Sequence, residues 1–413
     1  MFDFDPKIRP SRHYLPKSLV VSHKKPNFAA MIQSIATSMP MIVCGILTAQ
    51  LGLSLYDRWD RPRFRLLIFM ATATLLYTAH CIFFNNLTQA IPFSDTLYSF
   101  CNPAVYPLYY LYIEELTLHR PNRWRQFLML VPSIVCFLAV GLLYLLMSGA
   151  ETTAFIRGHL YQDEYSTLTG LAWWQAQAHL IVKIVFALQI PPILIMGWRH
   201  ITRYNTMVEQ NYSDTEDKTL APIKSLLVFF VITTLVSFLC NIIGRYRFAD
   251  SPWLLTVPSA TFSLLILLIG HLGLRQNFYI RDIAEAVDKP EPTAGATPKE
   301  DMALRERLRY VIDTEKIYLQ PNLKLEDLAN RLNSNRNYMY NVINVEMGIS
   351  FSEYINQKRI EYAAQQIRRN PKALLTDIAT ASGFTSTSAF YRNFKQFKHC
   401  TPSQFQREAL ESQ

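Results

Sequence analysis

The sequence predicts an all-α protein: a seven-transmembrane-helix bundle followed by a soluble domain of two helix-turn-helix units joined by a long helix. Three observations support this fold. Long apolar runs fill the first two thirds of the 413 residues, the last third is polar and charged, and a helix-turn-helix pattern occurs twice within it. This division is typical of a membrane protein with a soluble appendage. We expect a tail at residues 1–33, a membrane domain at 34–274, a connector at 275–300 and a soluble domain at 301–413.

Seven apolar stretches are long enough to cross a bilayer, which takes about 20 residues per helix. The third contains Pro103 and Pro107, and such breaks are tolerated where neighbouring helices satisfy the backbone. All six tryptophans fall at or just beyond an expected helix end, where an indole prefers to lie between lipid tails and water. The expected spans are residues 34–56, 65–85, 96–114, 126–148, 177–198, 223–243 and 253–274.

The charges of the loops predict the orientation. Arginines and lysines gather in the loops after the first, third and fifth expected spans, and are few in the second and fourth loops. By the positive-inside rule, the odd loops and the soluble domain are cytoplasmic, which places the N-terminus outside. The basic residues of the tail, such as Lys7 and Arg9, oppose this orientation. Either the later loops outweigh them, or the native start is Met31 or Met39, or the number of helices is not seven; we favour the first two explanations. The first 27 residues contain no long apolar core, so we expect the first membrane helix to act as the insertion signal.

Few ionisable side chains lie within the expected spans. Lys183 lies about two turns into the fifth span, and His179 precedes it by one turn on the same helix face. Charged groups at membrane depth are costly and often functional, so these two residues are our candidates for a ligand-sensing site. The alternative is that Lys183 reaches the outer surface and that the histidines form interhelical hydrogen bonds.

Two other functions compete for the membrane domain. A transporter usually shows internal repeats and paired broken helices, and the two halves of this domain show no convincing repeat. A metal-dependent enzyme would need His80, His179 and His271 to meet, but these residues lie on separate helices without a recognised ligand spacing. The six cysteines show no metal-ligand spacing either. We therefore predict no enzyme activity, no metal site and no cofactor.

Beyond the last span, residues 275–289 form an amphipathic pattern that predicts a short helix leaving the membrane. Residues 290–300 are rich in Pro, Ala and Thr, a composition typical of a flexible linker.

The clearer of the two helix-turn-helix patterns lies between Leu374 and Phe405. A short helical pattern is followed by a break at Gly383, and a second helical pattern has an apolar inner face and a basic outer face. Gly383 suits the tight turn because glycine tolerates a positive φ, and Ala379 suits the close crossing of the two helices. This layout predicts that the second helix lies in a DNA major groove.

The same architecture precedes it between Leu325 and Val345, with Ala329 in the place of Ala379 and Asn333 in the place of Gly383. Asn is the next residue after Gly to accept a left-handed conformation. A long amphipathic pattern at residues 350–369 joins the two units. If both second helices enter successive major grooves on one face of the duplex, they must lie about 34 Å apart.

These residues give the last third a clear resemblance to a known family. The stretches LEDLANRL, GISFSEYINQKRIEYA, DIATASGFTSTSAFYRNFK and CTPSQF are similar to the DNA-binding domain of the arabinose-regulator (AraC) family of bacterial transcription factors. One departure is His399, where the family usually has Gly. The layout of spans followed by this domain also resembles membrane-embedded members of the family. The resemblance implies that the partner of the soluble domain is promoter DNA.

The outward faces of the two second helices carry the candidate DNA contacts, because Asn can pair with adenine edges and Arg with guanine. Lys398 and the hydroxyls near the helix start are candidates for phosphate contacts. The alternative is an ordinary solvated helix face, which the repeat and the resemblance disfavour. The candidates are Asn335, Arg336, Asn337, Tyr340, Asn341 and Asn344 in the first unit, and Ser386, Thr387, Ser388, Tyr391, Arg392, Lys395 and Lys398 in the second.

The sequence therefore predicts a bacterial inner-membrane, one-component transcriptional regulator that binds promoter DNA as one chain or as a pair of chains. Its membrane domain would sense a small molecule or a membrane state, and residues 275–289 would transmit the signal by a population shift. The competing hypothesis is a membrane transporter or receptor with an attached autoregulatory DNA-binding domain.

Overall fold

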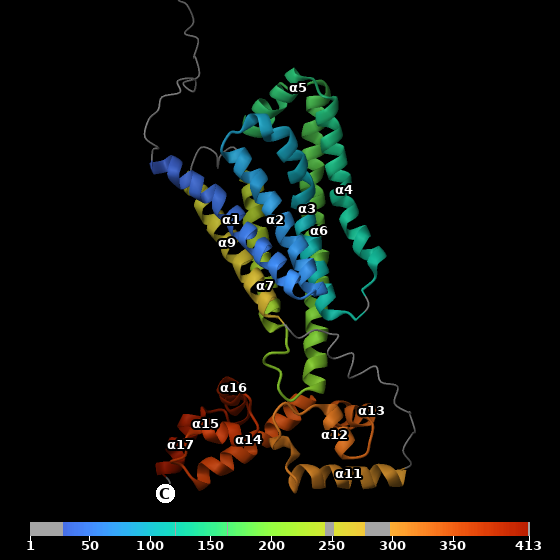
Figure 1. Ribbon diagram of the computed structural model, residues 1–413, viewed down its shortest axis with the longest axis vertical. Coiled ribbons are helices and arrows are strands. Elements are labelled where there is room, and N and C mark those ends of the chain that lie inside the picture. Colours follow the sequence, from blue (N-terminus) through green and yellow to red (C-terminus); the bar gives the residue numbers. More distant parts are fainter. Residues whose placement is uncertain (1–27, 120, 163, 244–251, 277–297, 412–413) are drawn as a thin grey trace, which may run out of the picture.

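The computed structural model describes residues 28–119, 121–162, 164–243, 252–276 and 298–411. These residues form an upper helical bundle and a lower helical domain, and no strand occurs among them (Figure 1). Most of the tail and of the connector expected from the sequence, including its amphipathic helix beyond residue 276, lies outside the described residues.

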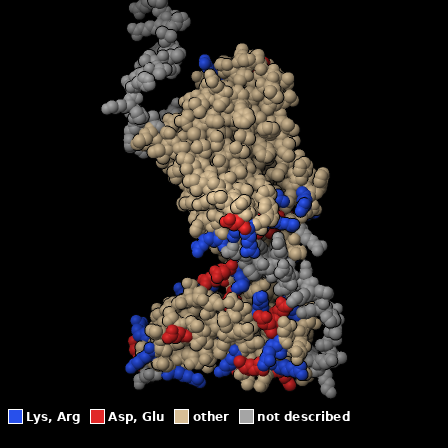
Figure 2. Space-filling view, in the orientation of Figure 1, with Lys and Arg blue, Asp and Glu red and all other residues tan. Residues whose placement is uncertain are grey.

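All seven expected spans are helical, and they make up the upper bundle (Figure 1). Five of these helices, α1, α2, α4, α6 and α9, are long and apolar enough to cross a membrane, and α7 contributes a shorter apolar stretch, Ala221–Val236. The surface of the bundle carries few charged side chains above its lower end (Figure 2). The helices are α1 (Phe28–Asp57), α2 (Arg61–Phe84), α3 (Ile91–Thr117), α4 (Arg123–Leu146), α6 (Gly170–Asn211), α7 (Ala221–Ile243) and α9 (Pro252–Arg275).

Helix α3 is not among the helices that are apolar enough to cross a membrane, and it is surrounded by protein. It packs against α2, α4 and α6, and most of its residues are buried. Its helix continues through Pro103 and Pro107. Its tyrosines meet polar groups of neighbouring helices: the Tyr106 hydroxyl lies 2.6 Å from Thr234 Oγ1, and the Tyr110 hydroxyl lies 3.3 Å from His200 Nε2.

Short helices cover the upper end of the bundle between α4 and α6. Helix α5 (Gly149–Ala154) continues into a π-helical turn, η2 (Phe155–Leu160). Phe155 and Ile156 of this turn are buried in a cluster with Phe83 and Phe84 of α2. The loop after α4 is therefore packed onto the protein.

Helix α6 is much longer than the span expected at residues 177–198. It runs for 42 residues, or about 63 Å, roughly twice the thickness of the hydrocarbon core. Its last turns, from Arg199 onward, are polar and leave the bundle towards the soluble domain (Figure 1). The sequence-based expectation ended the helix where the apolar run ends, but the helix continues because Ile201, Tyr204 and Val208 recur at helical spacing and are buried.

The soluble domain has two hydrophobic cores that share one long helix. Helix α14 inserts Phe351 and Ile355 into the first core, and Ile360 and Ile367 into the second. Its N-cap is Ser350, whose hydroxyl accepts a hydrogen bond from Glu353 N at 3.1 Å. The helices of this domain are α11 (Pro298–Asp313), η3 (Ile317–Leu319), α12 (Leu325–Arg331), α13 (Arg336–Tyr340), η4 (Asn341–Glu346), α14 (Phe351–Arg369), α15 (Leu375–Ala381), α16 (Thr387–Lys398) and α17 (Pro402–Glu411).

Candidate nucleic-acid interface

The first helix-turn-helix unit turns at Asn333, which has a φ of +52°. Ala329, one turn before it, is buried at the crossing of α12 with the next helix. Asn335 caps that helix, because its Oδ1 accepts a hydrogen bond from Tyr338 N at 2.7 Å. The helix continues from α13 into the π-helical η4, and we refer to α13 and η4 together as the first recognition helix.

The second unit turns at Gly383, which has a φ of +86°. A Cβ atom at this position would lie 2.6 Å from the Leu319 carbonyl oxygen, so the turn also needs the smallest residue for space. Ser386 caps α16, the second recognition helix, by accepting a hydrogen bond from Ala389 N at 3.0 Å. The helix ends at His399, which takes a left-handed conformation with a φ of +58° in the place where the family usually has glycine.

The candidate DNA contacts fall into two groups by exposure. Asn337, Asn341, Thr387, Ser388, Arg392 and Lys395 are exposed. Asn335, Arg336, Tyr340, Asn344 and Ser386 are half-buried. Tyr391 and Lys398 are also half-buried, and the Tyr391 hydroxyl lies 3.3 Å from Ser403 Oγ of α17, so this tyrosine also has a role in packing.

The lower end of α6 contacts the first recognition helix. Arg336 donates from Nε and Nη2 to Asn211 Oδ1 at 3.0 and 2.5 Å. Asn344 Nδ2 lies 3.5 Å from the Gln210 carbonyl oxygen. Two of the six candidates of the first unit are therefore held by the end of a helix that begins in the upper bundle.

The loop between α6 and α7, residues 212–220, contacts the second recognition helix. Glu216 accepts a short hydrogen bond from the Ser386 hydroxyl, and its Oε1 lies 3.5 Å from Arg392 Nη1. The Thr385 hydroxyl lies 3.4 Å from Asp214 Oδ1. A carboxylate thus binds the side chains at the start of α16, where a DNA phosphate would be expected.

The same loop is fixed between the two units by Arg359 of α14, which is fully buried. Arg359 Nη1 lies 3.3 Å from both carboxylate oxygens of Asp214, and Nε and Nη2 donate to the Tyr318 and Gln320 carbonyl oxygens at 2.7 Å each. Burial lowers the pKa of the Arg359 guanidinium, and the Asp214 carboxylate opposes this shift. The adjacent Asp214 carboxylate favours the charged guanidinium. The ion pair therefore anchors the loop to the soluble domain.

Further hydrogen bonds join the loop to α14 and to the segment before α12. Ser213 N donates to the Leu323 carbonyl oxygen at 3.0 Å, and the Ser213 carbonyl oxygen accepts from Asn356 Nδ2 at 2.9 Å. Asp214 Oδ2 accepts from Asn322 N at 2.8 Å. The loop is thus held by both units and by the helix between them.

Our reading of the sequence missed Arg359, Asp214 and Glu216. A signal for Arg359 was present, since it lies one turn from both Ile355 and Ala363 on the inward face of α14. A cation on an apolar face needs a buried partner. No local pattern could identify that partner, because Asp214 is 145 residues away.

The two candidates for ligand sensing lie in different surroundings. His179 is buried, with Nε2 2.7 Å from Asp95 Oδ2 and Nδ1 2.9 Å from the Gln175 carbonyl oxygen. Asp95 also accepts from the Tyr144 hydroxyl at 2.9 Å, so His179 is part of a network between helices. Lys183 is exposed on the outside of α6. His179 faces the neighbouring helices, whereas Lys183, four residues further along α6, is exposed. Asp95 was not among our candidates, because it lies just before the expected span at residues 96–114.

Among the described residues, no group of three or more His, Cys, Asp or Glu side chains could hold a metal ion. His80 lies beside Phe84 and Tyr98, and His271 is exposed.

Two recognition helices on one compact domain, each with a capped start and polar outer residues, define a DNA-binding module of the kind found in transcription regulators. Residues 328–408 match the family model of a helix-turn-helix domain. The last third of the chain therefore carries an AraC-type helix-turn-helix domain.

Similar proteins agree with this assignment. The Msm operon regulatory protein of Streptococcus mutans is 33% identical over 87 residues, which cover 21% of this chain and 31% of that protein. An HTH-type transcriptional regulator of Staphylococcus aureus is 28% identical over 100 residues, which cover 24% of this chain and 13% of that protein. Less than a third of either relative is matched. A solved structure of a Listeria innocua protein of unknown function has 30% identity, a TM-score of 0.23, and covers 25% of this chain and 95% of its own.

Proposed function

We propose that this protein is a membrane-bound, one-component transcriptional regulator that binds promoter DNA in a sequence-specific manner through both helix-turn-helix units. The observation that carries the proposal is the pair of recognition helices joined by α14. The helix-turn-helix match and the transcriptional regulators among the similar proteins support DNA as the partner.

The side chains on the two recognition helices assign the proposed contacts. Arg336 and Arg392 suit guanine, because a guanidinium can donate two hydrogen bonds to O6 and N7. Asn337 and Asn341 suit adenine, and both are exposed. Lys395 and the hydroxyls at the start of α16 suit phosphates, which fix the register without reading sequence.

Arginine variants of the full chain in lipid nanodiscs test this assignment. We expect wild-type protein to select, from random duplexes, two half-sites with centres about one DNA turn apart. Arg336→Ala should reduce base selectivity at one half-site and Arg392→Ala at the other. Each variant should bind the wild-type site more weakly by about 1–3 kcal/mol. Arg369→Ala, on the exposed last turn of α14, is the matched control and should leave selection unchanged. Selection of the same two half-sites by all four proteins would refute the proposal.

The membrane helices would place the soluble domain at the cytoplasmic face. The seven spans are part of this proposal: five helices meet the length and composition for crossing, while α3 is enclosed by its neighbours and α7 has a shorter apolar stretch. The loops after α1, α3 and α6 lie at the end of the bundle that faces the soluble domain (Figure 1), and the positive-inside rule assigns these basic loops to the cytoplasm. Pairing of two chains on a promoter also belongs to the proposal.

Control by the membrane domain would act through the lower end of α6 and the α6–α7 loop. Arg336, Asn344, Ser386 and Arg392 contact this segment, so they are not available to DNA in this arrangement. DNA binding would require the loop to leave the recognition helices, and a signal that favours the released arrangement would shift the population towards DNA binding. This route replaces the connector at residues 275–289 as our proposed path.

A further inference from the structure

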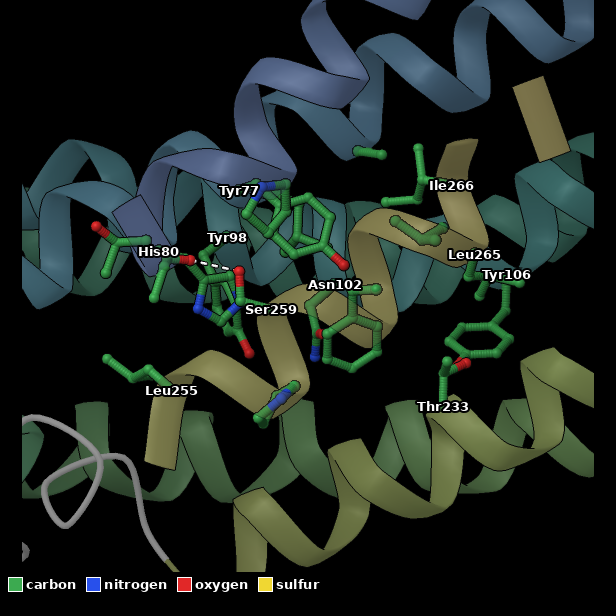
Figure 3. Close-up of a pocket in the computed structure, with 18 of the residues that line it drawn as sticks. Tyr77, His80, Tyr98, Asn102, Tyr106, Thr233, Leu255, Ser259, Leu265 and Ile266 are labelled. Carbon is green, nitrogen blue, oxygen red and sulfur yellow. Dashed lines mark hydrogen bonds between the residues drawn. The ribbon is translucent and has the colours of Figure 1, made fainter. Parts of the chain in front are cut away.

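The upper bundle contains a partly open cavity of about 170 Å³ between α1, α2, α3, α6, α7 and α9. Figure 3 shows residues of these helices around it, with Tyr77 and His80 from α2, Tyr98, Asn102 and Tyr106 from α3, and Leu255, Ser259, Leu265 and Ile266 from α9. Neither His179 nor Lys183, the candidates from the sequence, lines this cavity.

The lining determines the charge of the molecule that the cavity can accept. Aromatic and aliphatic side chains dominate it, and no Asp, Glu, Lys or Arg is among the described residues that line it. An ion that entered would lose its hydration without gaining an opposite charge, which costs far more than burial of a neutral group. The ligand is therefore uncharged and mainly apolar.

Two polar groups in the lining have unused hydrogen-bonding capacity. The side-chain amide of Asn102 and the hydroxyl of Tyr77 make no hydrogen bond with any described residue. Other polar groups of the lining are satisfied: the Ser259 hydroxyl donates to the Ala36 carbonyl oxygen at 2.5 Å, and the Tyr106 hydroxyl pairs with Thr234. An amide without a partner in an apolar environment costs about 1–3 kcal/mol, so a ligand that bonds to Asn102 gains this amount.

The volume sets the size of the ligand. A protein cavity of about 150 Å³ lined by apolar side chains accepts benzene. A cavity of about 170 Å³ accepts one ring with one small substituent. We propose that this cavity is a ligand-binding site for small, uncharged, single-ring compounds that carry one hydrogen-bonding group, held by Asn102 with Tyr77.

A ligand bound in this cavity would affect the α6–α7 loop through the two helices that carry it. This step of the inference rests on the proposed function. Phe186 of α6 and Phe230 and Thr233 of α7 line the cavity, and these two helices carry the loop at their lower ends. Phe230 stacks on Tyr109 of α3 with ring centroids 4.5 Å apart, so a displacement of this ring is passed to the core of the bundle. A ring-sized ligand that separates α7 from α3 would move the loop that contacts the recognition helices.

Ligand-observed fluorine NMR on the full chain in nanodiscs tests the site without DNA. The probes are 4-fluorophenol, fluorobenzene and 4-fluorobenzoate, which share one ring and differ in their polar group. We expect saturable binding of 4-fluorophenol, weaker binding of fluorobenzene and no saturable binding of 4-fluorobenzoate. Asn102→Leu should weaken 4-fluorophenol by about five- to tenfold, the value of one hydrogen bond, and leave fluorobenzene unchanged. Tyr77→Phe should also weaken the binding of 4-fluorophenol, by a smaller factor.

A second variant fills the cavity, and a matched control on the same helix separates loss of binding from loss of folding. Ala73 lines the cavity and is buried, so Ala73→Leu should abolish binding of both neutral probes. Ala71→Leu, on the same helix and outside the lining, is the matched control. The proposal is overturned if 4-fluorophenol does not saturate, if 4-fluorobenzoate binds equally well, or if Ala73→Leu binds as the wild type does. Because no readout here involves DNA, a failure of DNA binding would leave this result intact, and the reverse also holds.

Discussion

The two helix-turn-helix units have the same architecture but are held by the lower end of α6 and the loop after it in different ways. The first recognition helix is irregular, since it passes from α13 into a π-helical turn, and its Arg336 contacts a neutral amide, Asn211. The second is a regular helix of 12 residues, and its Arg392 contacts a carboxylate, Glu216. Asn211 is buried, whereas the Arg392 and Glu216 side chains are 56% and 35% exposed.

This difference shows that one segment, the lower end of α6 with the loop that follows it, can restrain two similar surfaces with different physical forces. A buried hydrogen bond from a charged donor contributes about 1.5–3 kcal/mol and depends little on salt. An exposed ion pair contributes about 0–1 kcal/mol and is screened by salt. We therefore expect the second unit to be released before the first. Three predictions test the comparison, from the largest expected effect to the smallest.

The two turns should respond very differently to substitution. Gly383→Ala should destabilise the soluble domain by about 2–4 kcal/mol, because the new Cβ would meet the Leu319 carbonyl oxygen at 2.6 Å and alanine would adopt a positive φ. Asn333→Gly should change stability by less than about 1 kcal/mol, since glycine accepts the φ of +52° without strain. Urea unfolding of the full chain in nanodiscs, followed by hydrogen exchange in residues 325–398, measures both. Equal effects of the two variants would contradict the comparison.

Much of each unit could be predicted from the sequence, because its determinants are local. Phe390 and Phe394 are fully buried as the helical spacing of the apolar residues predicts, and a break in the pattern marks the turn at Gly383. The π-helical turn of the first recognition helix was not predicted, since the sequence pattern distinguishes poorly between two helix types with close periods.

The restraint on the two units could not be predicted, because it depends on contacts distant in sequence. The span ending at Trp198 was read from apolar residues, which mark the membrane but not the end of the helix. Only the three-dimensional structure brings Asn211 within 3.0 Å of Arg336, at a separation of 125 residues. The same holds for the cavity, whose lining comes from six helices with no common motif.

Removing the contact from α6 and removing the contact from the loop should change DNA affinity by different amounts and with different salt dependence. Asn211→Ala removes the acceptor of both Arg336 hydrogen bonds, so we expect affinity of the full chain for its selected duplex to rise about tenfold, as the loss of a charge-assisted hydrogen bond implies. Glu216→Gln should raise it by less than about fivefold.

Salt separates the two contacts further. The gain from Glu216→Gln over the wild type should shrink as ionic strength rises from about 0.05 to 0.5 M, since screening already weakens the ion pair in the wild type. The gain from Asn211→Ala should persist. Asp217→Asn is the matched control, because Asp217 is an exposed loop carboxylate for which no hydrogen bond or salt bridge to a recognition helix is found. If DNA affinity falls in both Asn211→Ala and Glu216→Gln, the end of α6 and its loop support DNA binding and do not oppose it.

The smallest expected effect is a pH dependence of docking, by which we mean the contact between the lower end of α6 and the soluble domain. Glu209 lies near the lower end of α6, and its pKa is raised by burial and by the nearby carboxylate of Glu353, while Lys224 opposes the shift. Glu353 is on α14, so its repulsion exists only while the soluble domain is docked. A carboxyl group with a raised pKa in the docked arrangement binds a proton on docking. Docking therefore strengthens as pH falls through that pKa and weakens above it.

We expect the DNA affinity of the full chain to decrease by less than about threefold between about pH 7 and pH 5, relative to Glu209→Gln measured on the same duplex. The size is modest because the Glu209 side chain is only partly removed from water, which screens its charge. The ratio of wild-type to variant affinity removes any pH dependence that DNA binding itself has. If this ratio stays constant across the range, protonation of Glu209 is not linked to docking. In that case α14 lies further from the lower end of α6 than the hydrogen bonds of Asn211 imply.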